Sequence, residues 1–501
     1  MIERRPADFA RDRYDLLVVG GGVYGVAVTL EAALRGLRPL LLERADFGGG
    51  TTWNSFRIIH GGLRYLQTLD LRRFRESVHE RRWFLRHFAE LVRPFPFVMP
   101  ISGRGMRRVP IFRAALWLND LLSLRRNAGV ERTHHIGGGR VLGVSETLEL
   151  VPGLDRCGLR GAALWYDGVM TCAPRMLIEM LHWACAAGAR ALNYVEAKRL
   201  LMEGTRVAGL EAVDRTSGET LVIRAPVVVN CAGPEVRGVA RRLDRDIPHL
   251  FSPSIAFNLL ISRPPPSPIG VAVLPHAGAR TYFVRPWGDW SFAGTCHLPV
   301  SDEAAVHGPG PRDIEGMIAD LNAGLPGWGV GTDDVRRVFW GLLPVSTRGT
   351  VRLSTRPVLH DHARSGGPTG LFSLSGVKFT TARRVAEVLL AMILERVPGL
   401  RPGPVSPVER PEPATVPSAS ELRALLRADP AAARSLMIRL VAHEAVIEPD
   451  DLLLRRTDWG VDPEQRDVLA SQLGISLGAR SHVPGAVEQR AAAGGAEGRR
   501  A

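Results

Sequence analysis

The feature that most constrains the fold is a glycine-rich turn between a short apolar strand and a helix. Residues 14–19 form an apolar run of strand length, residues 26–34 have helical character, and a second apolar run at 39–42 ends at Glu43. The turn carries three glycines with the GxGxxG spacing, Gly20, Gly22 and Gly25. In such a βαβ unit the helix N-terminus holds a pyrophosphate and the acidic residue holds a ribose hydroxyl. The sequence therefore predicts a dinucleotide-binding unit at the start of the chain.

Length and composition are those of a globular protein with several domains. The chain has 501 residues, of which 45% are hydrophobic and 23% charged, and this length corresponds to roughly two to four domains. No apolar stretch reaches the ~18 residues of a membrane span, and residues 1–13 lack the apolar core of a secretory signal. The five cysteines include no CxxC pair. We therefore expect a cytoplasmic protein with reduced thiols.

The net charge of +13 comes almost entirely from arginine, since Lys198 and Lys378 are the only lysines. A basic surface favours polyanions such as nucleic acid or anionic lipid. So strong a preference for arginine is typical of genome base composition, however, and predicts no specific nucleic-acid partner. A lysine ammonium is a compact point charge that can lose its proton, which a guanidinium does not do. Lys378 is therefore a candidate functional residue.

Two arginine-rich segments, 71–91 and 104–126, have apolar residues at helical spacing. One interpretation is a helix whose apolar face joins the core and whose arginines are solvated. The other is a basic amphipathic surface that rests on anionic lipid. We favour the core-facing interpretation for the first segment and leave both open for the second.

The rest of the chain alternates strands and helices and ends in a separate helical region. Apolar runs predict strands at 207–210, 220–223, 227–230, 254–261, 281–284, 291–294 and 370–375. Helical patterns lie at 176–187 and 380–397. Residues 402–417 are rich in proline, which predicts a linker.

Several longer motifs carry a resemblance to a known family. They are TTWNS at 51–55, IIHGGLRYL at 58–66, WYDG at 165–168, LNYVE at 192–196, NCAGP at 230–234, SGVKFTT at 375–381 and DLLLRRT at 451–457. With the opening βαβ unit, they strongly resemble the FAD-dependent glycerol-3-phosphate dehydrogenases, which belong to the D-amino-acid-oxidase-like flavin oxidoreductases. The resemblance covers roughly residues 14–475, and motifs this long in the same order are poorly explained by chance.

The resemblance implies an α/β fold with three parts: a Rossmann-like FAD-binding domain, a mixed β-sheet substrate domain and a helical C-terminal domain. The oxidoreductase region would span 14–400, with FAD-binding segments at about 14–70, 155–245 and 350–395 and substrate segments at about 71–154 and 246–349. It would be followed by a linker at 401–418, a helical domain at 419–475 and a disordered tail at 476–501.

The resemblance also implies how FAD is held. The glycine turn would let backbone amides approach the pyrophosphate, and Glu43 would hold the ribose. Hydroxyl groups after the second strand would serve the phosphate and the ribityl chain, and a backbone contact would serve the adenine. A second helix N-terminus would face the ring carbonyls. The further positions that these roles involve are Thr51, Thr52, Ser55, Val195, Gly233, Gly376, Lys378 and Thr380.

On the substrate side, the family binds a phosphate with cations beside the flavin. Arg64, Tyr65, Arg356 and Lys378 match those positions. A single arginine in so basic a chain can also be an ordinary surface charge, although Arg64 lies inside a long motif. Together with Asn258, these residues are the candidate catalytic set.

Two substrate positions depart from the family. Asn258 stands where the family has a histidine that accepts the hydroxyl proton, and an amide cannot accept it. Leu343 stands where the family has a phosphate-binding arginine, and leucine offers no charge-assisted contact. His297 could be a relocated base, but a lone histidine after a strand is more often a hydrogen-bonded surface residue. His360 and His362 lack a third ligand that would indicate a metal site, so we expect no metal.

We therefore expect an FAD-dependent dehydrogenase that transfers a hydride from a small anionic alcohol, similar to glycerol 3-phosphate, to flavin N5. The resemblance implies a quinone as the electron acceptor and a peripheral position on the inner face of the cell membrane, and a homodimer stays open. One alternative is an FAD-dependent amine or amino-acid oxidoreductase, because an amine can lose its own proton to solvent. The other is a catalytically decayed flavoprotein with a binding role, which the charge of +13 would suit.

Overall fold

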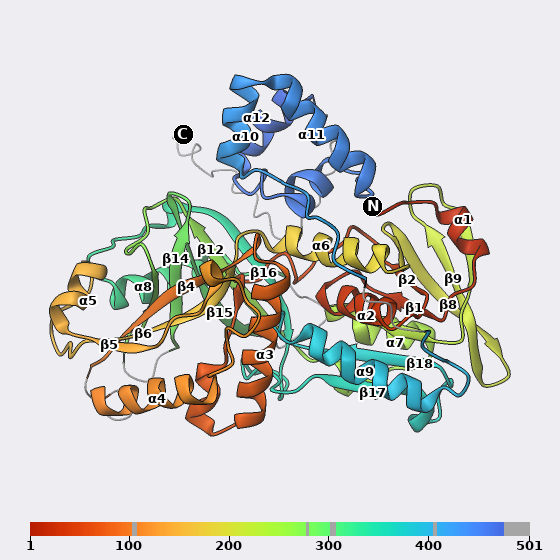
Figure 1. The fold of residues 1–501 in the computed structure, drawn as a ribbon, viewed down its shortest axis with the longest axis horizontal. Coiled ribbons are helices and arrows are strands. Elements are labelled where there is room, and N and C mark those ends of the chain that lie inside the picture. The colour runs from red at the N-terminus through yellow and green to blue at the C-terminus, as the bar shows by residue number, and fades with distance from the viewer. Residues whose placement is uncertain (103–107, 277–279, 301–306, 404–407, 475–501) are drawn as a thin grey trace, which may run out of the picture.

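The computed structural model describes residues 1–102, 108–276, 280–300, 307–403 and 408–474. These residues form two lobes with a helical unit above the junction between them (Figure 1). The strands within the described ranges make up a six-stranded, a three-stranded and a nine-stranded sheet.

The first lobe is built around the six-stranded sheet, in the order β17-β18-β11-β1-β2-β7. All neighbouring strands are parallel except β17, which is antiparallel to β18. Every residue of β1 and β2 is buried, as expected for parallel strands that are covered on both faces. The strands are Leu16–Val19 (β1), Pro39–Leu42 (β2), Arg190–Leu192 (β7), Val228–Asn230 (β11), Val358–Asp361 (β17) and Leu371–Ser375 (β18).

Helices and a small sheet cover the two faces of this lobe. On one face, α2 (Val23–Leu34) packs between α6 (Ala173–Ala186) and α9 (Ala382–Arg396). On the other face lie α7 (Val236–Leu243) and the antiparallel three-stranded sheet. The strands of that small sheet are Val195–Glu203 (β8), Arg206–Asp214 (β9) and Thr220–Arg224 (β10).

The second lobe is built around the nine-stranded sheet, in the order β16-β12-β15-β14-β13-β4-β6-β3, with β5 paired to β6. All nine residues of β12 are buried. Helix α8 (Pro311–Gly324) supplies apolar side chains to the core on one face of the sheet. The strands are Ile58–Ile59 (β3), Val92–Pro100 (β4), Arg140–Leu142 (β5), Ala162–Met170 (β6), Pro253–Ile261 (β12), Gly270–Val273 (β13), Tyr282–Trp287 (β14), Trp290–Pro299 (β15) and Val335–Pro344 (β16).

The helical unit contains α10 (Ala419–Ala428), α11 (Pro430–His443), α12 (Pro463–Leu473) and a π-helical turn at Asp451–Arg456. Its apolar side chains share one core with Trp53, which follows β2, and with Phe292 and Phe339 of the nine-stranded sheet. The unit therefore packs against parts of both lobes (Figure 1). The other α-helices of the described residues are α1 (Pro6–Arg11), α3 (Leu71–His87), α4 (Val109–Leu122) and α5 (Val144–Leu150), and a 3-10 helix at Leu63–Thr68 carries Arg64 and Tyr65.

The structure confirms the predicted α/β fold class. Helix α3 buries Phe74, Phe84 and Leu85, so the expected core-facing apolar side of the first arginine-rich segment is confirmed. The expectation that its arginines are solvated is wrong for Arg81, which is buried and paired with Asp167. Strand β6 pairs along its whole length with β4. Strand β6 lies within 155–245, the second segment expected to bind FAD. Because of its pairing with β4, we propose that β6 belongs to the substrate lobe. The tail at 476–501 lies outside the described residues, as do 404–407 of the linker.

None of the described helices is both long and apolar enough to cross a membrane.

Candidate active site

The glycine-rich turn is built too tightly for residues with side chains. A Cβ on Gly25 would lie 1.8 Å from the carbonyl oxygen of Gly20, and one on Gly20 would lie 2.6 Å from the carbonyl oxygen of Cys231. Gly20 also has a φ of 108°, a left-handed conformation that glycine adopts without strain. These contacts place the N-terminus of α2 at the carboxyl ends of β1 and β11, where an α/β sheet binds a pyrophosphate.

Glu43, directly after β2, ties this turn to the neighbouring strand end. Its Oε2 accepts a hydrogen bond from the amide of Gly21 at 2.6 Å, and its Oε1 accepts one from the amide of Ala45 at 2.8 Å. Burial raises the pKa of Glu43, and the two amide hydrogen bonds oppose that rise only in part. The amide of Val195 donates to the Glu43 carbonyl at 2.8 Å. The residues predicted to contact ribose and adenine therefore lie side by side.

The segment 51–55 connects the turn with the nine-stranded sheet. Thr52 Oγ1 accepts a hydrogen bond from the first amide of α2 at 3.1 Å, and Thr51 Oγ1 donates to a carbonyl of β16 at 3.2 Å. A Cβ on Gly341 of β16 would lie 2.9 Å from Thr51 Oγ1, so the strand rests directly on this segment. Among the described residues, the Ser55 hydroxyl is buried without a hydrogen-bond partner.

These features fit the expected FAD. The buried Ser55 hydroxyl lacks a partner that a cofactor could supply. A Cβ on Gly233, after β11, would have no atom of the described chain within 4 Å apart from its two chain neighbours, so there is space beside the strand end. The glycine turn would hold the pyrophosphate, Glu43 the ribose, and Thr51 and Ser55 the ribityl chain.

Three of the predicted substrate-side residues meet beside this cradle. Lys378 Nζ lies 4.2 Å from the ring centre of Tyr65, although the two are far apart in sequence. Burial and the neighbouring charge of Arg64 lower the pKa of Lys378 to about 8. The cluster therefore holds one fixed cation, one titratable cation and an aromatic ring.

Arg356 adjoins the same region. Hydrogen bonds from Arg73 and the charge of Arg356 lower the pKa of Asp70, which is five residues after Tyr65 in the chain. Arg356 also lines a cavity of about 210 Å³ whose wall includes Ser375, at the end of β18 and shortly before Lys378. The structure thus brings four predicted substrate-side residues toward the carboxyl end of β18.

Asn258 is buried, and both ends of its amide are engaged. Its Nδ2 donates to the carbonyl of Asn54 at 2.9 Å, and its Oδ1 accepts from the Thr295 hydroxyl at 2.8 Å. The side chain therefore joins segment 51–55 to the substrate sheet. Leu343 lies on β16 opposite Ser254 of β12.

The remaining cofactor-side positions pack against the two glycine-rich segments. The amide of His60 donates to Thr380 Oγ1 at 3.2 Å. A Cβ on Gly376 would lie 2.2 Å from the ring of Tyr24 in α2, so the chain before Lys378 runs directly over that ring. The prediction missed Tyr24, and only its place inside the GxGxxG turn could have indicated a role.

A histidine–carboxylate pair was also missed, although both residues lie in quoted motifs. His60 Nδ1 lies 3.7 Å from Asp167, and the His60 side chain is 58% exposed. Asp167 accepts hydrogen bonds from the amide of Gly61 at 2.6 Å and from Arg81 at 2.8 Å. Burial alone would raise the pKa of Asp167, but His60 and Arg81 lower it below its ordinary value.

His297 and His362 lie in different surroundings. His297 lies within β15 and is half-buried, which corrects its expected surface position after a strand. His362 is buried, and its two ring nitrogens lie 2.8 Å from Asp244 and from Ser373.

Comparison with known proteins places the chain in a family. Residues 15–392 match the family model described as FAD dependent oxidoreductase. A glycerol-3-phosphate dehydrogenase from Synechocystis sp. is 30% identical over 75% of this chain and 69% of its own length. The mitochondrial glycerol-3-phosphate dehydrogenase of Bos taurus is 31% identical over 75% of this chain, but this match spans about half (52%) of that relative.

The fold has counterparts among solved flavoproteins. A glycerol-3-phosphate dehydrogenase from Bacillus halodurans, solved with FAD, superposes with a TM-score of 0.68 at 20% identity and covers 94% of this chain and 93% of its own. An L-α-glycerophosphate oxidase from Mycoplasma pneumoniae, also with FAD bound, has a TM-score of 0.55 at 14% identity and covers 76% of this chain and 95% of its own. With the family match over most of its length, the chain belongs to the FAD-dependent oxidoreductases.

Proposed function

We propose that the protein oxidises a small alcohol that carries a phosphate, with glycerol 3-phosphate as the substrate that the names of its relatives suggest. The observation that supports this most directly is the convergence of Arg64, Tyr65 and Lys378 beside the FAD cradle. Guanidinium and ammonium groups are the side chains that bind phosphate through charge-assisted hydrogen bonds. Arg356, on the adjoining cavity, would add a further cation.

Each of these residues would have a separate part in the reaction. Bound FAD supplies an acceptor for a hydride. Arg64 and Lys378 would hold the substrate phosphate, and the Tyr65 ring would fix the lysine side chain that stands over it. Holding the alcohol in one orientation removes much of the entropy that would otherwise oppose the reaction. Because Leu343 stands where the family has a phosphate-binding arginine, this site has one cation fewer than the family pattern.

The test is an anaerobic visible spectrum of the purified holoprotein before and after addition of glycerol 3-phosphate. Loss of the flavin absorbance is expected, whereas glycerol at the same concentration should leave the spectrum unchanged because it offers no phosphate. Bleaching by amino acids but not by glycerol 3-phosphate would favour the amine-oxidising alternative. A protein without flavin would contradict the proposal.

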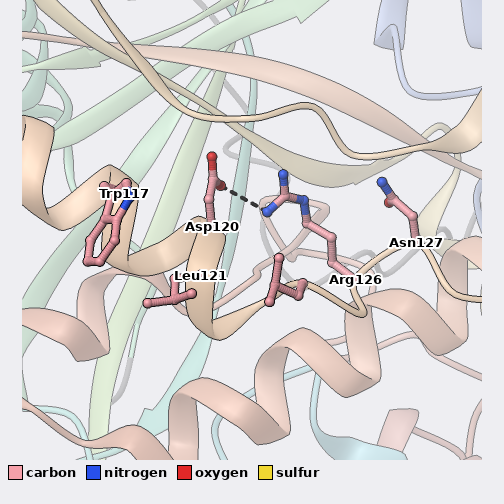
Figure 2. Close-up of a pocket in the computed structure, with 6 residues that line it drawn as sticks. Trp117, Asp120, Leu121, Arg126 and Asn127 are labelled. Carbon is pink, nitrogen blue, oxygen red and sulfur yellow. Dashed lines mark hydrogen bonds and ion pairs between the residues drawn. The ribbon is translucent and has the colours of Figure 1, made fainter.

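We also propose that the protein lies on the cytoplasmic face of the cell membrane and passes electrons to a quinone. The supporting surface is the α4 patch, defined here as Trp117, Leu121 and Leu124, whose side chains are 67%, 45% and 78% exposed. Trp117 and Leu121 project from α4 at a surface cavity of about 320 Å³ that the patch helps to line (Figure 2). Exposed Arg113 and Arg125 accompany it. An exposed apolar patch with arginines around it suits an anionic lipid surface.

A further inference from the structure

The proposed reaction needs a group that takes the substrate's hydroxyl proton. The side-chain amide of Asn258 already donates to Asn54 and accepts from Thr295, so it has no free basic atom. Another group at the site must therefore take the proton. This question rests on the proposed function, because it concerns the oxidation of an alcohol.

The strand register turns His297 toward the same face of the sheet as Asn258. His297 lies opposite Ala256 of β12, while Cys296 and Leu298 join the core between the sheet and α8. Because neighbouring residues of a strand point to opposite faces, His297 points away from that core. That other face is the one on which Gly341 of β16 contacts segment 51–55.

The imidazole of His297 has an unused nitrogen and cationic neighbours. In the described part of the chain, His297 Nδ1 is buried and has no hydrogen-bond partner. A buried polar atom without a partner is rare in folded proteins and is often completed by a ligand. Arg280, which precedes β14, donates a hydrogen bond to the carbonyl of His297 at 2.9 Å. Its charge and that of Arg64, which also acts on Lys378, lower the pKa of the ring. His297 is therefore placed at the cation cluster that would hold the phosphate.

We propose that His297 is the proton acceptor of this enzyme and replaces the histidine that is absent at position 258. The hydroxyl O–H bond breaks and its proton bonds to the imidazole, while the carbon's C–H bond breaks and its hydrogen leaves as a hydride to the FAD. The alcohol thereby becomes a carbonyl compound and loses two electrons. The proton leaves the imidazole to solvent before the next turnover.

Substrate binding would itself strengthen this base. Burial and the charges of Arg280 and Arg64 lower the pKa of His297 to about 4, so the free imidazole is neutral and a weak base. A bound phosphate brings negative charge to Arg64 and offsets one of the two cations. The pKa of His297 then moves back toward its ordinary value, near which a general base is most effective at neutral pH. Proton transfer is thus coupled to recognition of the phosphate.

The kinetic test compares His297→Gln with His60→Gln, the other histidine at the site, and with His135→Gln, an exposed histidine outside it. Stopped-flow reduction by glycerol 3-phosphate should slow by about 10²–10⁴-fold in H297Q, with FAD content unchanged. H135Q should match the wild type. Imidazole added to His297→Gly should restore part of the rate. The proposal is overturned if H297Q stays within about threefold of the wild type. It is also overturned if H60Q slows flavin reduction more than H297Q does, and if the pH dependence of the rate changes in H60Q rather than in H297Q.

A second test needs no turnover. Inorganic phosphate is titrated into the holoprotein by calorimetry at a pH between about 4 and 6.5, in two buffers with different ionisation enthalpies. Proton uptake on binding is expected in the wild type and should be absent in H297Q. Because this uptake favours binding, H297Q should also bind phosphate more weakly at this pH, and the two affinities should converge above about pH 7. Equal uptake in both proteins would contradict the coupling. If glycerol 3-phosphate does not reduce the flavin although phosphate-linked uptake by His297 is present, the proposed substrate fails and the coupling stands.

Discussion

The hydroxyl of Tyr24 bridges the backbone of Lys378, accepting a hydrogen bond from its amide and donating one to its carbonyl, both at 3.0 Å. Tyr24 lies in the first turn of α2, within the segment that would hold the pyrophosphate. Its ring lies against the position where Gly376 would carry a Cβ, 2.2 Å away. One side chain therefore fixes the lysine of the substrate site relative to the turn of the cofactor site.

Replacement of Tyr24 by phenylalanine keeps the ring and removes both hydrogen bonds. We expect the affinity for inorganic phosphate to fall by about five- to thirtyfold, because each of the two lost hydrogen bonds contributes about 1 kcal/mol. FAD content should not change. Calorimetric titration of phosphate into the holoprotein measures the effect. An unchanged affinity, or loss of FAD instead, would show that the bridge does not position Lys378.

The charge of Lys378 should make phosphate binding depend on pH. Because its pKa is lowered to about 8, the lysine is charged at neutral pH and loses its charge as the pH rises through that value. Between about pH 7 and 9, where phosphate is mainly a dianion, the KM for glycerol 3-phosphate should therefore rise. Lys378→Met should raise KM by about 10–100-fold, as expected for a lost hydrogen bond to a charged group.

Lys378→Arg provides the matched control for this titration. A guanidinium keeps its proton throughout this range, so the rise of KM above neutral pH should disappear even if the affinity is lower overall. The same pH dependence in Lys378→Arg and in the wild type would assign the titration to another group.

The strand-end carboxylate offers a test of the cofactor cradle. Glu43→Gln keeps the size of the side chain but offers the amides of Gly21 and Ala45 a neutral acceptor. We expect FAD to bind about tenfold more weakly, since hydrogen bonds to charged groups contribute about 1.5–3 kcal/mol against about 1 for neutral ones. Equilibrium dialysis against free FAD measures this, and Glu149→Gln, at an exposed position of α5, is the control.

The sign of the pH effect follows from the direction of the Glu43 shift. Its pKa lies above the ordinary value of 4.5, so the carboxyl gains a proton at a higher pH than other glutamates as the solution is acidified. FAD affinity should therefore fall on acidification in the wild type. It should fall less in Glu43→Gln, whose amide does not titrate.

The α4 patch predicts binding to anionic vesicles. Trp117→Gln, Leu121→Gln and Leu124→Gln together remove the exposed apolar side chains, each of which contributes about 1.5–3 kcal/mol when fully buried. Sedimentation with phosphatidylglycerol vesicles should show at least about tenfold weaker binding of this variant, and wild-type binding should weaken with salt. Ala114→Gln, beside the patch, is the control. Equal sedimentation of the variant and the wild type would place membrane contact elsewhere.

Local features of the fold could be predicted from the sequence, whereas long-range pairing could not. The glycine turn and Glu43 are readable because a βαβ unit is completed within about 30 residues. Strand β4 was not predicted, since Pro94 and Pro96 remove the amides that a central strand needs. The structure tolerates them because β13 pairs with β4 only at Phe97 and Val98, beyond both prolines.

The candidate site, too, could be predicted only where it depends on local sequence. The resemblance supplied Arg64, Arg356 and Lys378, and the structure brings them to one region. No spacing rule links Tyr24 to Lys378, because the contact depends on how α2 and the segment after β18 pack together. The direction of His297 depends on a register shift between Phe257 and Asn258, and a shift of one residue reverses the face of a side chain.

A buried ion cluster between the helical unit and the cofactor lobe should be necessary for stability. Asp46, shortly after Glu43, receives two hydrogen bonds from Arg456 at 2.6 and 2.8 Å and one from Arg455 at 3.0 Å. Burial alone would raise the pKa of Asp46, but the two guanidiniums lower it below its ordinary value. Segment 451–457 thus packs on the loop that leads to Thr51, which gives this motif a role that the sequence alone does not reveal.

Asp46→Asn should leave the buried charge of Arg456 without the carboxylate that it contacts most closely, since Glu444 lies 4.0 Å away. Removing one partner of a buried ion pair costs about 3–5 kcal/mol. We therefore expect the variant to release FAD, and its helical unit to unfold, at a clearly lower urea concentration than in the wild type. Flavin fluorescence and circular dichroism report the two events. Asp8→Asn, at an exposed position of α1, is the control. The double variant Asp46→Leu with Arg456→Met should be less destabilised than Asp46→Asn alone, because it leaves no unpaired charge at this pair. If the single variant unfolds like the wild type, the cluster is not what holds the helical unit in place.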